Sequence, residues 1–181
     1  MTSGSQPFPL ADREALGYTE HAGSISVARS MQAIPDIDWD RAIEHERSHI
    51  DMLLPMNDLA IEFGLQCFAI AGRLPQHTDC VSYSELTSGM ILDCGPDLEL
   101  NAGGRRIAVR TGDQFLLNPH VRHGAETVHR LVFVAMDESR HSLPDAAECR
   151  SLFIEKLSRV ALRYPARPAR NDDRQTEGHA V

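Results

Sequence analysis

The sequence predicts a mainly β protein in which short strands form a sandwich or barrel and helices flank them. From residue 67 onward, apolar side chains alternate with a period of two, as they do along a half-buried strand. Glycine, asparagine and proline recur at near-regular spacing in the same part of the chain, and they indicate turns between six or seven short strands.

Length and composition exclude several classes of protein. A chain of 181 residues is expected to form one domain, and 42% hydrophobic residues can bury a core. A net charge of −8 argues against a nucleic-acid binder with a basic face, and no apolar run is long enough to span a membrane. The four cysteines form no Cys-x-x-Cys motif, so a zinc knuckle or disulfide framework is not expected, and a cytoplasmic location fits.

The residues before the strands divide into an arm and a helical part. Residues 1–36 are rich in Ser, Gly, Pro and charge and are expected to form an N-terminal arm, with one short element near residues 25–27. The single domain is expected over residues 37–164. Its first helix is predicted over 37–54 from three-and-four spacing of apolar residues, and a second short helix over 59–63 ends at Gly64.

The remaining predicted elements are the strands of the domain, its last helix and a tail. Pro144-Asp145 predicts the start of a helix that runs to about Tyr164, and residues 165–181 are expected to be a disordered tail. The predicted strands lie at 67–71, 88–92, 98–109 (a hairpin turning at Gly103-Gly104), 115–117 and 130–136.

Candidate metal ligands lie between these strands. His77-Thr78-Asp79 follows a turn, and His123 comes one strand-and-hairpin unit later. Because side chains alternate along an extended chain, His77 and Asp79 point to one side. Two histidines and one carboxylate form the facial ligand set of mononuclear non-haem iron, which leaves the opposite face of the metal open.

The segment from Gly72 to Asp137 resembles a known family through four motifs: His77-Thr78-Asp79, Gly112-Asp113-Gln114-Phe115-Leu116-Leu117-Asn118-Pro119, His123-Gly124, and the strand that starts at Arg130. It is similar to the Fe(II)/2-oxoglutarate dioxygenases, nearest to the prolyl-hydroxylase-like members, whose core is a double-stranded β-helix (a jelly roll or cupin-like barrel). The resemblance implies Fe(II) on His77, Asp79 and His123, and 2-oxoglutarate on Arg130. It also implies hydroxylation of an unactivated C–H bond of an amino acid, peptide or small molecule, with succinate and CO2 as co-products.

Arg130 also has a physical reason to bind an anion. It begins an apolar strand and shares a face with Val132 and Val134. A guanidinium among apolar side chains needs an anion, and two of its N–H groups can donate in parallel to the two oxygens of a carboxylate. That carboxylate belongs either to a cosubstrate or to a neighbouring residue such as Glu126 or Asp137.

Three alternatives stay open. The same stretch also resembles a cupin, in which His77, Glu85 and His123 hold the metal without 2-oxoglutarate. His45-Glu46-Arg47-Ser48-His49 matches the zinc-peptidase motif, since both histidines would share a helix face, although its charges also suit a solvated face with i, i+4 pairs. The third alternative is a metal-free binding module. The expected partner is a small-molecule or peptide substrate, and neither nucleic acid nor a membrane.

Overall fold

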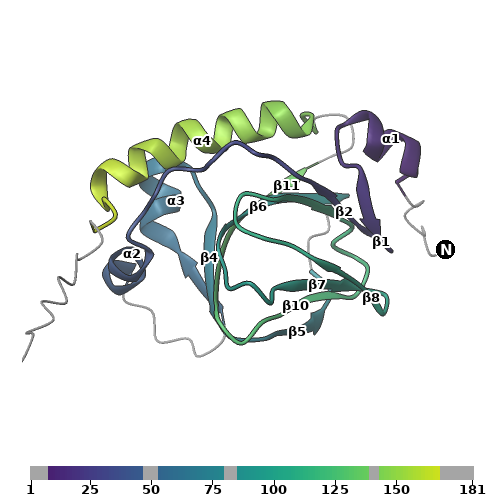
Figure 1. The fold of residues 1–181 in the computed structure, drawn as a ribbon, viewed down its shortest axis with the longest axis horizontal. Coiled ribbons are helices and arrows are strands. Elements are labelled where there is room, and N and C mark those ends of the chain that lie inside the picture. Colours follow the sequence, from purple (N-terminus) through teal and green to yellow (C-terminus); the bar gives the residue numbers. More distant parts are fainter. Residues whose placement is uncertain (1–7, 47–52, 80–84, 139–142, 168–181) are drawn as a thin grey trace, which may run out of the picture.

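The chain folds into two antiparallel sheets with helices along one side (Figure 1). The computed structural model describes residues 8–46, 53–79, 85–138 and 143–167. The larger sheet contains, in spatial order, β1 (Glu20–Ala22), β2 (Ile25–Ala28), β9 (Gln114–Leu117), β6 (Leu86–Asp93), β11 (Arg130–Glu138), β4 (Cys67–Ala71) and β3 (Leu53–Met56). The smaller sheet contains β5 (Leu74–His77), β10 (His123–Glu126), β7 (Glu99–Ala102) and β8 (Arg105–Ala108). The prediction of a mainly β protein with flanking helices is confirmed.

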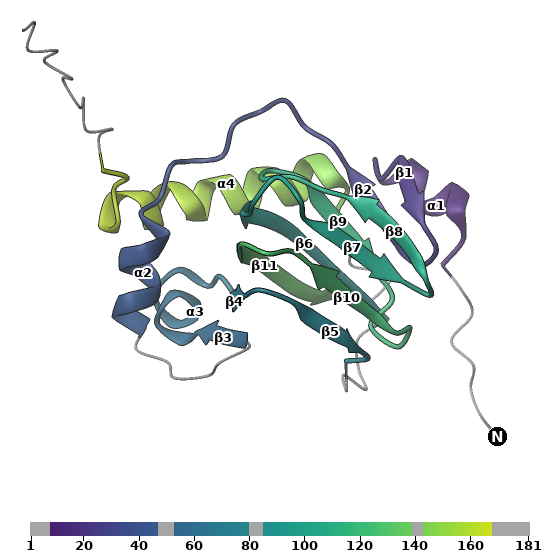
Figure 2. The same ribbon diagram turned by 60° about the horizontal axis from the view of Figure 1, so that its bottom comes forward.

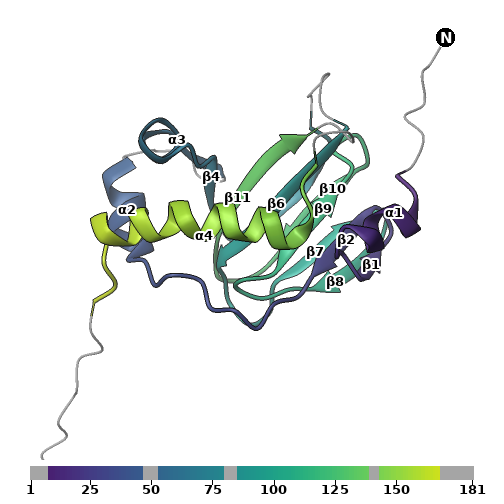
Figure 3. The same cartoon turned by 90° about the horizontal axis from the view of Figure 1, so that it is seen from above.

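Four helices complete the described part of the chain: α1 (Leu10–Ala15), α2 (Trp39–Glu46), α3 (Asn57–Phe63) and α4 (Ala146–Arg163). Figure 3 shows α4 lying across the seven-stranded sheet. Its start is fixed by Asp145, whose side chain accepts a hydrogen bond from the Glu148 N–H at 2.8 Å. The predicted helix start at Pro144-Asp145 is therefore confirmed. No helix in the described ranges has both the length and the apolar character to cross a membrane.

Of the three apolar cores in the described part of the chain, two lie on opposite faces of the large sheet. One lies between the helices and the large sheet and includes Trp39, Phe153 and Val134; the other lies between the two sheets, which face each other in Figure 2, and includes Leu100 and Leu131. Strand β11 contributes to both cores, because successive side chains point to opposite faces of a sheet. This alternation decides which of its residues can reach the space between the sheets.

The first predicted helix is wrong at its C-terminal end, where the structure has a strand. Helix α2 ends at Glu46, and Leu53 and Leu54 lie in strand β3; the residues between them lie outside the described ranges. Strand β3 is an edge strand that pairs with β4. An edge position accommodates Pro55, which has no N–H to donate.

The described part of residues 1–36 is built into the fold rather than forming an arm. Strand β2 pairs with β9 through Ser26↔Leu116 and places Val27 in the core between the sheets. The expected short element near residues 25–27 is thus strand β2. All four of its residues are buried, so the strand shows no alternation of buried and exposed positions. Of the predicted tail, residues 168–181 lie outside the described ranges.

Candidate metal centre

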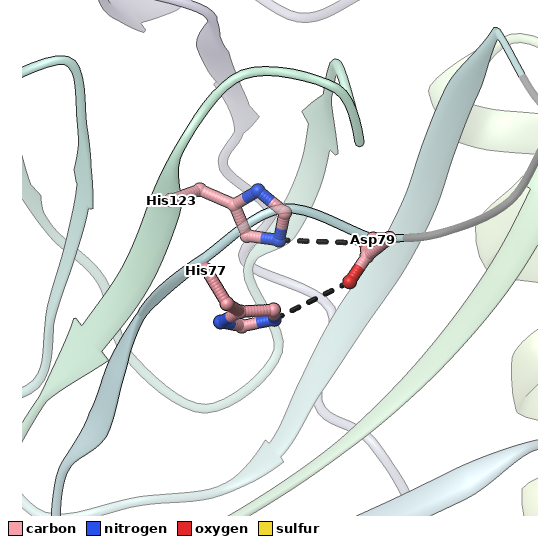
Figure 4. A group of neighbouring side chains, drawn as sticks. All are labelled: His77, Asp79 and His123. Carbon is pink, nitrogen blue, oxygen red and sulfur yellow. Dashed lines mark ion pairs between the residues drawn. The ribbon is translucent and has the colours of Figure 1, made fainter.

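Two neighbouring strands of the small sheet bring two histidines together. His77 ends β5, His123 begins β10, and the two residues are direct cross-strand partners. Their ring centroids are 4.6 Å apart. Asp79 follows β5 by two residues, and its backbone N–H donates to the carbonyl of Pro119 at 2.8 Å, which fixes the chain after the strand. The three side chains turn toward one point in Figure 4.

The carboxylate of Asp79 lies between the two imidazoles. Its Oδ1 is 3.3 Å from His77 Nε2, and its Oδ2 is 3.4 Å from His123 Nε2. The potential ligand atoms of the three residues lie within 4.8 Å of one another. Ligands at about 2.1 Å from one transition-metal ion are about 3 Å apart at right angles, so the spacing fits a single ion. The structure therefore brings together the three predicted ligands.

Both histidines have a backbone carbonyl next to Nδ1, which leaves Nε2 as the nitrogen available to a metal. His77 Nδ1 is 2.9 Å from the carbonyl of Pro75, and His123 Nδ1 is 2.8 Å from the carbonyl of Val121. A carbonyl oxygen only accepts, so each Nδ1 carries the proton and donates it. In the neutral ring each Nε2 then has its lone pair directed at the shared point, and second-shell bonds of this kind orient histidine ligands in metal sites.

Burial favours the neutral, ligating form of His123. Its side chain is 9% exposed, whereas those of His77 and Asp79 are 38% and 33% exposed. Burial lowers the pKa of His123 below its ordinary value, and the nearby His77 lowers it further, although the hydrogen bond to Val121 and the charge of Asp79 act in the opposite direction. The three residues thus lie at a boundary, with solvent on one side and the protein interior on the other.

A cavity of about 420 Å³ extends from the three residues into the space between the sheets. Its polar groups lie mainly where strands end, and Thr87 Oγ1 there donates to Asp137 Oδ1 at 2.8 Å. Among the described residues, no arginine or lysine lines it. Most of its wall is apolar and comes from both sheets: Ile25, Phe68, Leu74, Ile91, Leu100, Phe115, Leu117, Ala125, Leu131, Phe133 and Ala135.

The structure does not bring Arg130 to this cavity. Leu131 and Phe133 line the cavity, so Arg130 lies on the other face of β11, where Val132 packs against the helices. Its guanidinium forms a hydrogen-bonded ion pair with Asp93, at 2.5 Å between Nη2 and Oδ2, and a second ion pair with Asp40 of α2. Arg130 does share a face with Val132, as predicted, but that face packs against helices. Its partners are neither Glu126 nor Asp137.

Among the described residues, the structure does not group the three ligands of the cupin alternative, His77, Glu85 and His123. The carboxylate that groups with His77 and His123 in the described ranges is that of Asp79, and Glu85 is not a member of the group.

The zinc-peptidase motif is divided between described and undescribed residues. Glu46 accepts hydrogen bonds from the backbone N–H groups of Asp58, at 3.0 Å, and Leu59, at 3.1 Å, and so caps the start of α3. His45 Nε2 lies 3.5 Å from Asp58 Oδ2. The second histidine of the motif, His49, lies outside the described residues.

Sequence reasoning did not assign a role at the cavity to Asp137. The signal for it was present, because Asp137 is separated from Leu131 and Phe133 by even numbers of residues and therefore shares their face of β11.

Comparisons with known proteins add little to this geometry. No family model and no curated protein matches the sequence. A solved structure, an oxidoreductase of the 2OG-Fe(II) oxygenase family from Burkholderia pseudomallei, is similar over 75% of this chain and 80% of its own, with 15% identity and a TM-score of 0.35. What this chain does must therefore be inferred from its own residues.

Proposed function

We propose that this protein is an Fe(II)-dependent oxygenase that holds the metal on His77, Asp79 and His123. One observation carries the proposal: two Nε2 atoms and a carboxylate converge on one point while both Nδ1 protons are donated to backbone carbonyls. Two histidines and one carboxylate on one face suit Fe(II) in oxygenases. The double-stranded β-helix implied by the sequence resemblance would support such a set at the end of its barrel.

The residues of the site have separate tasks. Iron, when bound, supplies the redox chemistry by which O2 reacts. The hydrogen bonds to Pro75 and Val121 hold both imidazole rings in the ligating orientation. The apolar walls keep water from the site and would hold a substrate C–H bond beside a metal bound by these three residues.

Electron balance separates two versions of the reaction. Hydroxylation places one oxygen atom of O2 in the substrate, and the other atom must then be reduced by two electrons. In the version that the family resemblance implies, 2-oxoglutarate supplies them, takes up the second oxygen atom, and leaves as succinate and CO2. In the second version both oxygen atoms enter the substrate and no cosubstrate is needed. The cavity favours the second version, because no cation among its described residues would hold the distal carboxylate of 2-oxoglutarate.

The test is anaerobic titration of Fe(II) by calorimetry. We expect one Fe(II) per chain in the wild type and no binding to His123→Ala in the same range, because that variant lacks one of three ligands. His129→Ala is the matched control, since His129 is exposed and lies 3.7 Å from Asp97 rather than at the metal site. Absence of iron binding by the wild type, or equal binding by His123→Ala, would overturn the proposal.

A further inference from the structure

We infer, resting on the proposed function, that the cavity binds one ligand with an apolar body and a hydrogen-bond-donating head at Asp137, and that it excludes the dicarboxylate 2-oxoglutarate. The head is an ammonium or a hydroxyl group. The inference joins two features of one cavity: apolar walls between the sheets, and the Thr87–Asp137 pair at the end that holds the metal ligands.

The interior of the cavity favours a ligand whose main part is apolar. Its walls bring together side chains from strands of both sheets, with Phe68 and Phe133 stacked at 5.3 Å between ring centroids. A cavity of about 420 Å³ lies within the range of small-molecule sites, about 300–1,000 Å³. Transfer of apolar surface from water into such a space is favourable roughly in proportion to the area buried.

The same interior disfavours a dicarboxylate. Two neutral histidines, one carboxylate and Fe(II) together carry a single positive charge, which the keto-acid end of 2-oxoglutarate would neutralise. The distal carboxylate would then extend among apolar walls that contain, in the described ranges, no arginine or lysine. A buried carboxylate without a cation is strongly unfavourable. Asp137 adds a repulsive charge at the rim of the cavity.

The rim of the cavity favours a ligand whose head group donates a hydrogen bond. Asp137 and Thr87 are cross-strand partners in β11 and β6, and Thr87 in turn pairs with Leu117 of β9. The chain after β9 reaches Pro119, whose carbonyl holds Asp79, so Asp137 and the metal ligands lie at the same end of the strands. Thr87 fixes the carboxylate through Oδ1, and a carboxylate has further lone pairs with which to accept from a ligand.

The experiment measures binding rather than turnover, in both metal-free and Fe(II)-loaded anaerobic protein. The neutral fluorophore N-phenyl-1-naphthylamine reports on the cavity, and n-octylamine, 1-octanol, octanoate and 2-oxoglutarate are tested as competitors. We expect n-octylamine and 1-octanol to displace the fluorophore at about tenfold lower concentration than octanoate. We expect 2-oxoglutarate neither to displace it nor to give a visible charge-transfer band with Fe(II).

Two pairs of variants locate the binding. Asp137→Asn should reduce the preference for n-octylamine over octanoate, whereas Glu155→Gln, which changes an exposed carboxylate on α4, should keep it. Ala135→Leu should weaken fluorophore binding by filling the cavity, whereas Ala147→Leu, at an exposed position of α4, should not.

Several outcomes would overturn the inference. They are lack of fluorophore binding, equal or better binding of octanoate, an unchanged preference in Asp137→Asn, and a charge-transfer band with 2-oxoglutarate. The fluorophore-displacement readings are independent of whether iron binds, because the metal-free protein is measured too, and the charge-transfer reading is taken only on protein shown to hold Fe(II). Failure of the proposed function would appear instead as loss of the iron signal with the ligand preference intact.

Discussion

Two sequence motifs in this chain, His45-Glu46-x-x-His49 and His77-x-Asp79, both match known metal-binding patterns. In the structure their carboxylates have different partners. In α2, Glu46 accepts two backbone N–H groups of α3, so its oxygens have a structural role. After β5, Asp79 places one oxygen near each of two imidazoles, whose other nitrogens donate to carbonyls. The difference shows that a metal motif is recognised by where its acceptor and donor atoms are directed, and not by spacing alone.

The largest expected effect separates the two motifs directly. His77→Ala should lower the affinity for Fe(II) by more than about a hundredfold, because it removes a ligand rather than a second-shell partner. His45→Ala should leave the affinity unchanged, and calorimetry with Co(II) or Fe(II) under argon measures both. Metal loss in His45→Ala together with retention in His77→Ala would instead assign the metal to the helical motif.

A smaller effect tests the structural role of Glu46. Glu46→Ala should lower the free energy of unfolding by about 1 kcal/mol, because two N–H groups at the start of α3 lose their acceptor. Urea denaturation measures the change. Glu44→Ala, at an exposed position in the same helix, should change stability by less than about 0.5 kcal/mol. Equal stability of the two variants would show that the cap contributes nothing.

The smallest effect concerns Arg130. Arg130→Ala should lower the free energy of unfolding by about 1 kcal/mol or less, since its ion pairs with Asp93 and Asp40 are partly exposed. Iron affinity and ligand preference should match those of an Arg105→Ala control, which changes an exposed arginine in β8. If Arg130→Ala abolished a 2-oxoglutarate signal seen in the wild type, Arg130 would have to face the cavity.

Local signals in the sequence predict much of the fold. The hairpin of β7 and β8 turns at Gly103 and Gly104, whose φ angles of 58° and 78° suit glycine, and this turn follows from composition. The start of α4 follows from Asp145 as a cap. The grouping of the three candidate metal ligands follows from the alternation of side chains and from a turn that returns the chain to a neighbouring strand.

The errors arise where tertiary context decides. Alternation showed that Arg130 and Val132 share a face, but it does not show which face meets the cavity and which meets a helix. Strand β2 pairs with β9, which lies far along the chain. Leu53 and Leu54 lie in an edge strand because their segment pairs with β4. Such long-range pairing leaves no local pattern, so a short apolar segment fits either a helix or a strand.

The position of His77 on β5 has a consequence for the whole small sheet. Strand β5 is an edge strand of four residues, and its pairing with β10 is irregular between His123 and Ala125. An ion held by His77 and His123 would act as a reversible crosslink that clamps this edge to its neighbour. By mass action, an ion at a hundred times its dissociation constant stabilises the fold by about 2.7 kcal/mol. The stability of this edge would then depend on the supply of the bound ion, so an ion at this site would stabilise the small sheet in addition to any chemistry it supplied.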